Sequence, residues 1–255
     1  MPTLDLNHER IYYALYRGEL RPSRSILLIH GAGENHLVWP AVLRRLPDAT
    51  VYAIDLPGHG KSTGEGRTSI GDYVAWLKNF LDALKIQHAI IVGHSMGTAV
   101  AQLFALTHPD RAAGLVLIGA GAKLRVAPKI LELARNDLAA AAELISSLAW
   151  GPNVPEQIVR LGKQQLLATR SEVIYGDYKA CNEFDVIDRL GDIHAPTLII
   201  SGTADRMTPP KYAAFMNEKL TNARLVSVPE AGHMTMLEAE SMVVREVETF
   251  LQEQP

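Results

Sequence analysis

The chain has 255 residues, 21% of them charged and 47% hydrophobic, a composition that excludes a disordered chain and is typical of a globular protein. This length accommodates one large α/β domain with an insertion. The formal net charge is −3 and basic and acidic residues are mixed along the sequence, so we expect neither nucleic acid nor a membrane as a partner.

Short β-branched runs alternate with helical patterns along the chain, which predicts a mostly parallel sheet covered by helices on both faces. The first two runs, at residues 3–6 and 10–18, are expected to form an antiparallel pair. Six further strands are expected at residues 25–30, 50–55, 89–93, 114–119, 197–202 and 224–229. The predicted fold class is therefore α/β, with an eight-stranded sheet.

Three helices between and after these strands carry recognisable signals. Ser69 and Asp72 form a capping box, and apolar residues then recur at helical spacing as far as residue 84. Thr208 is expected to cap a helix whose first turn holds Pro209 and Pro210. The last helix is expected over about residues 236–251.

Residues 122–190 break the alternation of strands and helices. This stretch has no strand-like run; it has two helical segments, at 129–150 and 155–170, and further helical turns after them. An insertion of this kind between two strands predicts a helical cap. We therefore expect a core domain made of residues 1–121 and 191–255, with the cap at 122–190.

The only cysteine, Cys181, cannot form an intramolecular disulfide, which favours a reducing compartment. Its acidic neighbours would raise the pKa of a thiol, so a buried spectator is the expected role. The first residues carry charges where a signal peptide needs an apolar core, and no apolar run approaches the length of a membrane span. We expect a cytoplasmic protein, either a monomer or a homodimer.

The sequence GHSMG at residues 93–97 joins the predicted strand at 89–93 to a helical pattern, the context that the GxSxG motif requires. A sharp turn from strand to helix strains the central residue, Ser95, and needs small residues at Gly93 and Gly97. The turn would raise the Ser95 hydroxyl at the carboxyl ends of the strands, where open α/β sheets bind ligands. An anion forming there could be held by the Met96 N–H at the positive end of the helix.

A serine hydroxyl is a weak nucleophile and needs a base with an acid to orient it. Asp205 directly follows the seventh predicted strand and His233 follows the eighth, which gives the order nucleophile, acid, base. The loop after the sixth predicted strand holds no acidic residue. A second anion donor is expected from the glycine-lined loop after the third strand, where Ala32 lies between Gly31 and Gly33.

With these pieces, nearly the whole chain resembles the α/β-hydrolases. The matching motifs are HGAG at 30–33, DLPGHGKS at 55–62, GHSMG at 93–97, GTAD at 202–205 and AGH at 231–233. The resemblance implies Ser95 as nucleophile, with Asp205 and His233 as its partners. It also implies Ala32 and Met96 as the oxyanion-hole donors, and it places a cap where the insertion lies.

Other residues near these motifs allow two interpretations each. His36, Trp39, Trp150 and Met234 either line the substrate pocket or fill the core, and Met96 and Met236 are ambiguous in the same way. His30 and His59 are expected to brace their loops, whereas His94 should point away from the pocket. The cap supplies apolar residues for a pocket roof: Leu138, Leu144, Ile145, Leu148, Trp150, Val173, Ile174 and Phe184.

Serine, histidine and an oxyanion hole together perform acyl transfer. Proteins that resemble this one and act on halides or epoxides have an aspartate where this chain has Ser95. We therefore expect a carboxylesterase whose substrate is a small-molecule ester, small to medium in size and largely apolar. A carbon–carbon bond (diketone) hydrolase, a lactonase or a thioesterase remains an alternative, as does a receptor that binds without turnover.

No cofactor and no metal are expected. GHGKS at residues 58–62 imitates the end of a phosphate-binding loop, but the glycine that such a loop needs is replaced by Asp55. The two GxG sequences lack the third glycine of a dinucleotide fingerprint, and no HExxH or paired-cysteine pattern occurs.

Overall fold

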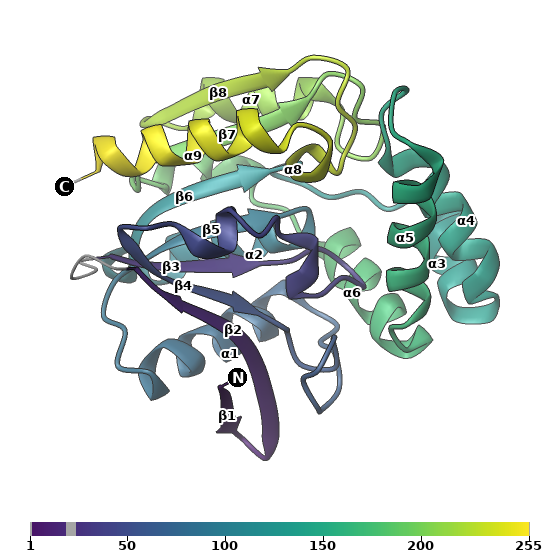
Figure 1. The fold of residues 1–255 in the computed structure, drawn as a ribbon, viewed down its shortest axis with the longest axis horizontal. Helices are drawn as coiled ribbons and strands as arrows, with labels where there is room; N and C mark the ends of the chain where they lie inside the picture. The colour runs from purple at the N-terminus through teal and green to yellow at the C-terminus, as the bar shows by residue number, and fades with distance from the viewer. Residues whose placement is uncertain (1, 19–23, 255) are drawn as a thin grey trace.

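The computed structural model describes residues 2–18 and 24–254, and it contains one eight-stranded sheet flanked by helices (Figure 1). Its strands lie side by side in the order β1-β2-β4-β3-β5-β6-β7-β8. They are β1 Thr3–Leu6, β2 Glu9–Arg17, β3 Arg24–Ile29, β4 Ala49–Ile54, β5 Ala89–His94, β6 Ala112–Ile118, β7 Thr197–Gly202 and β8 Ala223–Val228. β1 pairs with β2 and β2 with β4 in antiparallel fashion, and every later pair is parallel. The predicted fold class is confirmed.

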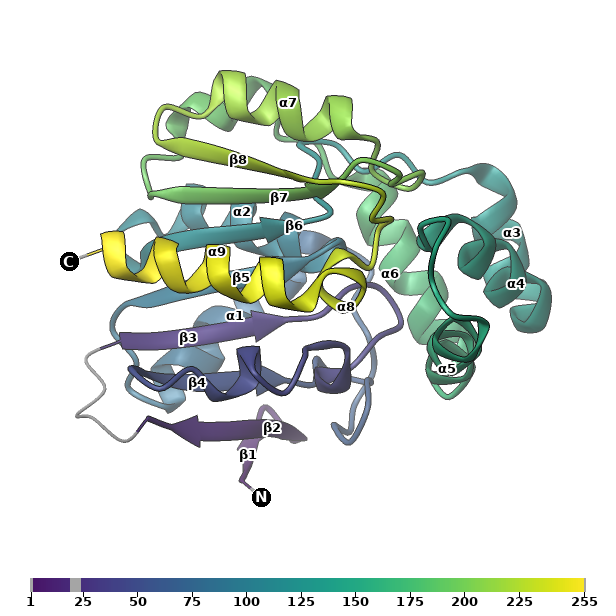
Figure 2. The same ribbon diagram turned by 45° about the horizontal axis from the view of Figure 1, so that its top comes forward.

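Both faces of the sheet are buried because side chains alternate along each strand. Leu27 and Ile29 of β3 face one side, where they join a core with α1 Ile70–Ala83, α2 Met96–Thr107 and α7 Pro210–Lys219. Ile26 and Leu28 face the other side, which α9 Glu240–Glu253 covers (Figure 2). α8, Thr235–Glu238, is one short turn before α9.

Four α-helices between β6 and β7, called the cap below, form a separate layer beside the carboxyl ends of the strands (Figures 1 and 2). They are α3 Pro128–Asn136, α4 Leu138–Ala149, α5 Glu156–Leu167 and α6 Ser171–Glu183. The sequence pattern suggested one segment where α3 and α4 lie. The break falls at Asp137, whose backbone is non-helical and whose side chain accepts a hydrogen bond from the Ala140 N–H, so it caps α4.

Of the helix starts and ends predicted in the core domain, some are confirmed and others differ in the structure. Ser69 accepts a hydrogen bond from the Asp72 N–H at 3.1 Å, as the capping box predicts. Thr208, by contrast, does not cap α7, because the N-cap is Pro209 and the Thr208 hydroxyl turns to a neighbouring carboxylate. The last predicted helix is divided at Ala239 into α8 and α9. No helix in the described ranges is long and apolar enough to cross a membrane.

Candidate active site

The turn at Ser95 is built for close approach of β5 to α2. Ser95 has φ 49° and ψ −114°, an unfavourable backbone conformation for a residue with a side chain. A Cβ atom on Gly93 would lie 2.4 Å from the Gly97 carbonyl oxygen, and one on Gly97 would lie 2.1 Å from the Ile29 carbonyl oxygen. Both glycines are therefore required before the serine can stand at the carboxyl end of the sheet.

Asp205 and His233 follow β7 and β8 and meet in the interior. The His233 Nδ1 lies 2.8 Å from Asp205 Oδ2, which also accepts a hydrogen bond from the Thr208 hydroxyl at 2.7 Å. Burial would raise the pKa of Asp205, but the charge of His233 and the hydrogen bonds from His233 and Thr208 outweigh it, so this pKa lies below its usual value. Asp205 is therefore a carboxylate, and it holds the Nδ1 proton of His233.

Ser95 and His233 lie at the same cavities. Both residues line the same two cavities, and His233 Nε2 is buried without a hydrogen-bond partner in the described residues. Because Nδ1 carries the ring proton, Nε2 presents a lone pair. It is thus placed to accept the proton of a nucleophile.

One N–H of the loop after β3 is kept free. The Gly31 N–H donates to Glu34 Oε2 at 2.7 Å and the Gly33 N–H donates to Asp177 Oδ2 at 2.8 Å. The Ala32 N–H between them has no partner in the part of the chain that the structure describes, and Ala32 lines the first cavity beside Ser95. Met96, the first residue of α2, presents the other free N–H, because the first amides of a helix have no partner within it.

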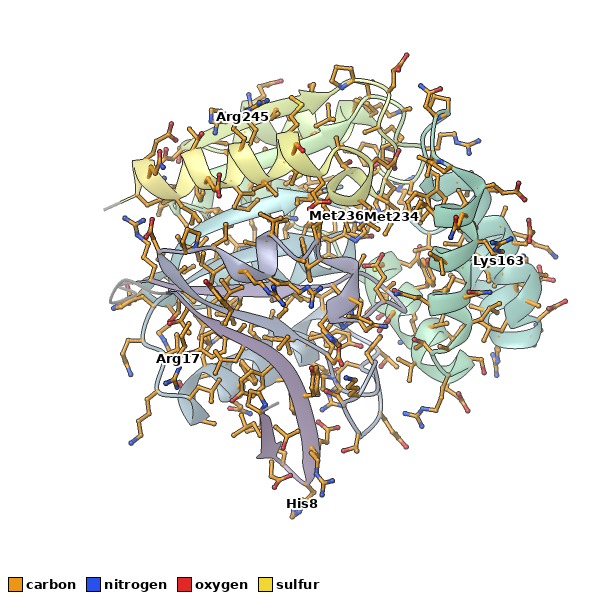
Figure 3. All side chains as sticks on the ribbon, in the orientation of Figure 1. His8, Arg17, Lys163, Met234, Met236 and Arg245 are labelled. Atoms are coloured by element: carbon orange, nitrogen blue, oxygen red, sulfur yellow. The ribbon has the colours of Figure 1, made fainter. Side chains whose placement is uncertain are left out.

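Two cavities meet at Ser95, His233, Tyr178 and Met207. The first, about 80 Å³, lies between the core and the cap and is mostly apolar. Met234 and Trp150 line it, which is one of the two interpretations given for them, and so does Lys163 of α5. In Figure 3, Met234 is labelled on the side of the core toward the helix that carries Lys163. The second cavity, about 140 Å³, runs toward the segment before α3.

Of the two interpretations given for His36 and Trp39, the pocket is wrong and the core is correct. His36 Nδ1 lies 2.8 Å from Asp55 Oδ1, and Asp55 is completely buried, so the histidine serves to satisfy that carboxylate. Trp39 is also completely buried and packs in the core on the α9 side of the sheet. Met96 and Met236 are core residues too, each without exposed surface.

The sequence profile described as the alpha/beta hydrolase family matches residues 26–246. The chain belongs to this family. It is 28% identical over 243 residues to the pimeloyl-[acyl-carrier protein] methyl ester esterase of Pectobacterium carotovorum subsp. carotovorum (strain PC1), a match covering 89% of this chain and 94% of the relative. A solved thermophilic esterase is 32% identical, with a TM-score of 0.86 over 99% of this chain and 97% of its own. The enol-lactonase from Burkholderia xenovorans LB400 shares the fold, with a TM-score of 0.90 at 23% identity over 99% and 100%.

This alpha/beta hydrolase supports its site with a buried histidine that the sequence only partly revealed. His94 points away from the cavities, as expected, and its Nδ1 lies 2.9 Å from Glu34 Oε2. Its Nε2 lies 3.1 Å from the His233 carbonyl oxygen. Both partners are acceptors, so both ring nitrogens must carry protons and the ring is an imidazolium. Burial lowers the pKa of His94, but the charge of Glu34 outweighs this and raises it above its usual value.

Replacing Glu34 by glutamine should move the titration of His94 to lower pH, since the opposing charge is lost. The His94 pKa is raised in the folded state, so its stabilising effect is present below the unfolded value of 6.5 and is lost as pH rises through the folded pKa. Glu34 has a lowered pKa, so its effect is lost in acid. The unfolding free energy of Glu34→Gln should therefore fall furthest below that of the wild-type protein between about pH 4.5 and 6.5.

Ring NMR of the histidines follows the titration of His94, and urea unfolding at several pH values follows the free energy. Exchanging Glu132, an exposed carboxylate paired with Lys129 on α3, for glutamine is the matched control. A His94 titration that does not move in Glu34→Gln would contradict the ion pair.

A second buried cluster links α6 to the loop after β3. Asp177 of α6 has no exposed surface, and besides the Gly33 N–H it accepts hydrogen bonds from His59 Nε2 at 2.8 Å and the Tyr73 hydroxyl at 2.5 Å. The other nitrogen of His59 lies 3.0 Å from the Pro57 carbonyl oxygen, so this ring is also an imidazolium. His59 braces its turn as expected, but no sequence signal pointed to Asp177, because its partners lie far away in the chain.

His30 and Cys181 have the structural roles that the sequence suggested. The His30 Nδ1 donates to the Gly31 carbonyl oxygen and its Nε2 accepts from the Leu56 N–H, so the neutral ring braces the loop after β3. Burial lowers the pKa of His30 to about 4. Cys181 is free and buried, and burial, with Asp177 second, raises the pKa of its thiol. The described residues contain no group of three or more His, Cys, Asp or Glu that could hold a metal ion.

Proposed function

We propose that this alpha/beta hydrolase is a carboxylesterase that forms an acyl-enzyme on Ser95. The observation that carries the proposal is a convergence of three groups. Ser95, His233 and Ala32 all line the first cavity, and the Ser95 hydroxyl, His233 Nε2 and the Ala32 N–H have no partner within the described residues. A nucleophile, a base and an anion donor left unsatisfied at one place are the requirements of acyl transfer.

The mechanism follows from these positions. As the Ser95 oxygen attacks the ester carbonyl carbon, His233 Nε2 takes the serine proton, and Asp205 stabilises the resulting imidazolium. The carbonyl oxygen becomes an anion held by the Ala32 and Met96 N–H groups, each contributing about 2.7–4 kcal/mol of barrier reduction in comparable enzymes. His233 then protonates the departing alcohol, and water, activated by the same nitrogen, releases the acid.

The substrate class is supported by the relatives and by the first cavity. Relatives named as esterases match nearly the full chain. The cavity is small and has an apolar lining that includes Val38, Ile145 and Leu166, which favours small to medium, largely apolar esters. A lactone is an internal ester open to the same attack, so lactonase activity is the second candidate. We also propose a cytoplasmic location, which the buried free thiol of Cys181 supports.

A fluorophosphonate probe should add mass at Ser95, and Ser95→Ala should abolish this labelling, because only an activated serine reacts quickly with the probe. Ser146, which also lines the first cavity, provides the matched control, and Ser146→Ala should label normally. Absence of labelling in folded protein would overturn the enzyme proposal and favour a receptor.

Across p-nitrophenyl esters of rising acyl length, kcat/KM should peak at short or medium chains, because the first cavity holds only about 80 Å³. A maximum at long chains would contradict the size preference. A 1,5-diketone, a lactone and a thioester assayed beside these esters test the alternatives, and a diketone cleaved faster than every ester would identify a carbon–carbon bond hydrolase.

A further inference from the structure

The second cavity differs from the first in the charges around it. Arg125 and Arg206 line it together with Tyr212 and the apolar residues near α3, and no carboxylate lies among its described lining residues. The cavity reaches Ser95 and His233, so a group bound at the arginines can be part of the molecule that Ser95 attacks.

These two arginines make no direct ion pair within the described part of the chain, whereas three neighbouring lysines do. Lys123 is paired with Asp185, Lys129 with Glu132 and Lys163 with Glu143. The pKa of Asp185 is lowered first by its hydrogen bond with Lys123 and, less, by the charge of Arg125, so Arg125 only shares a carboxylate that Lys123 holds. Arg206 donates only to the Ser147 carbonyl oxygen among the described residues. Both arginines are exposed, so their charges are accessible to a ligand.

The first cavity has no unpaired charge close to the nucleophile among its described lining residues. Glu34 lines it beside Ser95, but this carboxylate is paired with His94. Lys163, the cation in the described lining, is paired with Glu143. An anionic group would therefore find no free cation in the first cavity and be attracted to the second.

We propose that the substrate is an ester with one half that ends in a carboxylate or phosphate, bound by Arg125 and Arg206 while the other half occupies the first cavity. This inference rests on the proposed esterase function and defines its substrate. Guanidinium groups suit this role because their planar N–H forks match carboxylate and phosphate oxygens.

Two series of esters test the proposal. In one, methyl esters of dicarboxylic acids from succinate to suberate carry the free carboxylate on the acyl half. In the other, butanoate esters of ω-hydroxy acids carry it on the alcohol half. The corresponding primary amides are neutral partners of the same shape. In at least one series, kcat/KM for the best anionic ester should exceed that of its amide at least tenfold.

Variants of the two arginines test whether these residues cause the preference for anionic esters. In the double variant Arg125→Gln/Arg206→Gln the ratio of anionic to neutral kcat/KM should fall at least tenfold, whereas Arg125→Lys/Arg206→Lys should retain most of it. Lys129→Gln removes an exposed cation of α3 outside the cavity lining and should leave the ratio unchanged. The proposal is overturned if the ratio of anionic to neutral kcat/KM is at or below one at every length in both series. It is also overturned if the glutamine double variant keeps the wild-type ratio.

Binding to Ser95→Ala separates this proposal from the esterase function. Calorimetry should show the anionic ester binding at least tenfold more tightly than its amide. Equal affinities overturn the anion site even if neutral esters are hydrolysed. If no ester is hydrolysed and Ser95 is not labelled, the esterase function fails, while tighter binding of the anionic ester would still support the site.

Discussion

Replacing Asp205 by asparagine should lower kcat for ester hydrolysis by about 10⁴, with the fold retained, as in serine proteases with the same exchange. The reason lies in the other groups that bind Asp205. Its Oδ1 accepts the N–H groups of Met207 and Thr208, so an asparagine would place its carbonyl oxygen there. Its NH₂ would then face His233 Nδ1, which must accept, and the ring proton would move to Nε2. His233 would then carry its proton on Nε2 and could not accept the proton of Ser95.

Steady-state kinetics with a p-nitrophenyl ester measure this effect, and the rate of fluorophosphonate labelling should fall in parallel. The control is Asp185→Asn, which removes an exposed carboxylate paired with Lys123 and should leave kcat unchanged. A loss of less than tenfold for Asp205→Asn would mean that another group orients His233.

Asp177→Ala should lower the free energy of unfolding by about 3–5 kcal/mol, because it leaves the buried His59 without its counter-charge. The Gly33 N–H and the Tyr73 hydroxyl also lose their acceptor. Burial lowers the pKa of His59, but the charge of Asp177 outweighs it and raises this pKa above the usual 6.5. The stabilising effect is thus present below pH 6.5 and is lost as pH rises through the folded pKa, so the deficit should shrink in alkali.

Urea unfolding followed by circular dichroism gives the free energies. Asp185→Ala breaks a partly exposed ion pair at the end of the same segment and should cost no more than about 1 kcal/mol. If Asp177→Ala and Asp185→Ala lower the free energy of unfolding by similar amounts, burial of the Asp177 cluster does not increase its contribution to stability. We also expect Asp177→Ala to reduce kcat, since the free Ala32 N–H depends on the fixed position of Gly33.

The sequence was most informative where short-range patterns decide the structure. All eight strands could be predicted because each shows a β-branched or aromatic run or an alternation of polar and apolar residues. Ser95 could be recognised because Gly93 and Gly97 lie two residues on either side of it. Asp205 and His233 followed from their positions after β7 and β8, since the ends of parallel strands meet at one edge. The lateral order of the strands could not be read in the same way.

Contacts between segments that are far apart in the chain could not be predicted from the sequence. Asp177 of α6 contacts Gly33 in the loop after β3, and Glu34 of that loop contacts His94 at the end of β5. Neither pair has a local sequence signature. Thr208 resembled a helix cap, but its hydroxyl gains more from the buried Asp205 than from the end of α7. His36 was misassigned for the same reason, because its ring satisfies a buried carboxylate that only the folded chain brings near.

The position of the cap within the sequence sets an order in which the site is assembled during synthesis. Ser95 and strands β3 to β6 all come from residues 24–118, whereas β7 and β8 follow the four cap helices. The β6–β7 pair closes a loop that contains the whole cap, at an entropic cost that grows only slowly with loop length. A growing chain therefore holds its serine well before Asp205 and His233 exist, and the nucleophile stays inert until the sheet is complete.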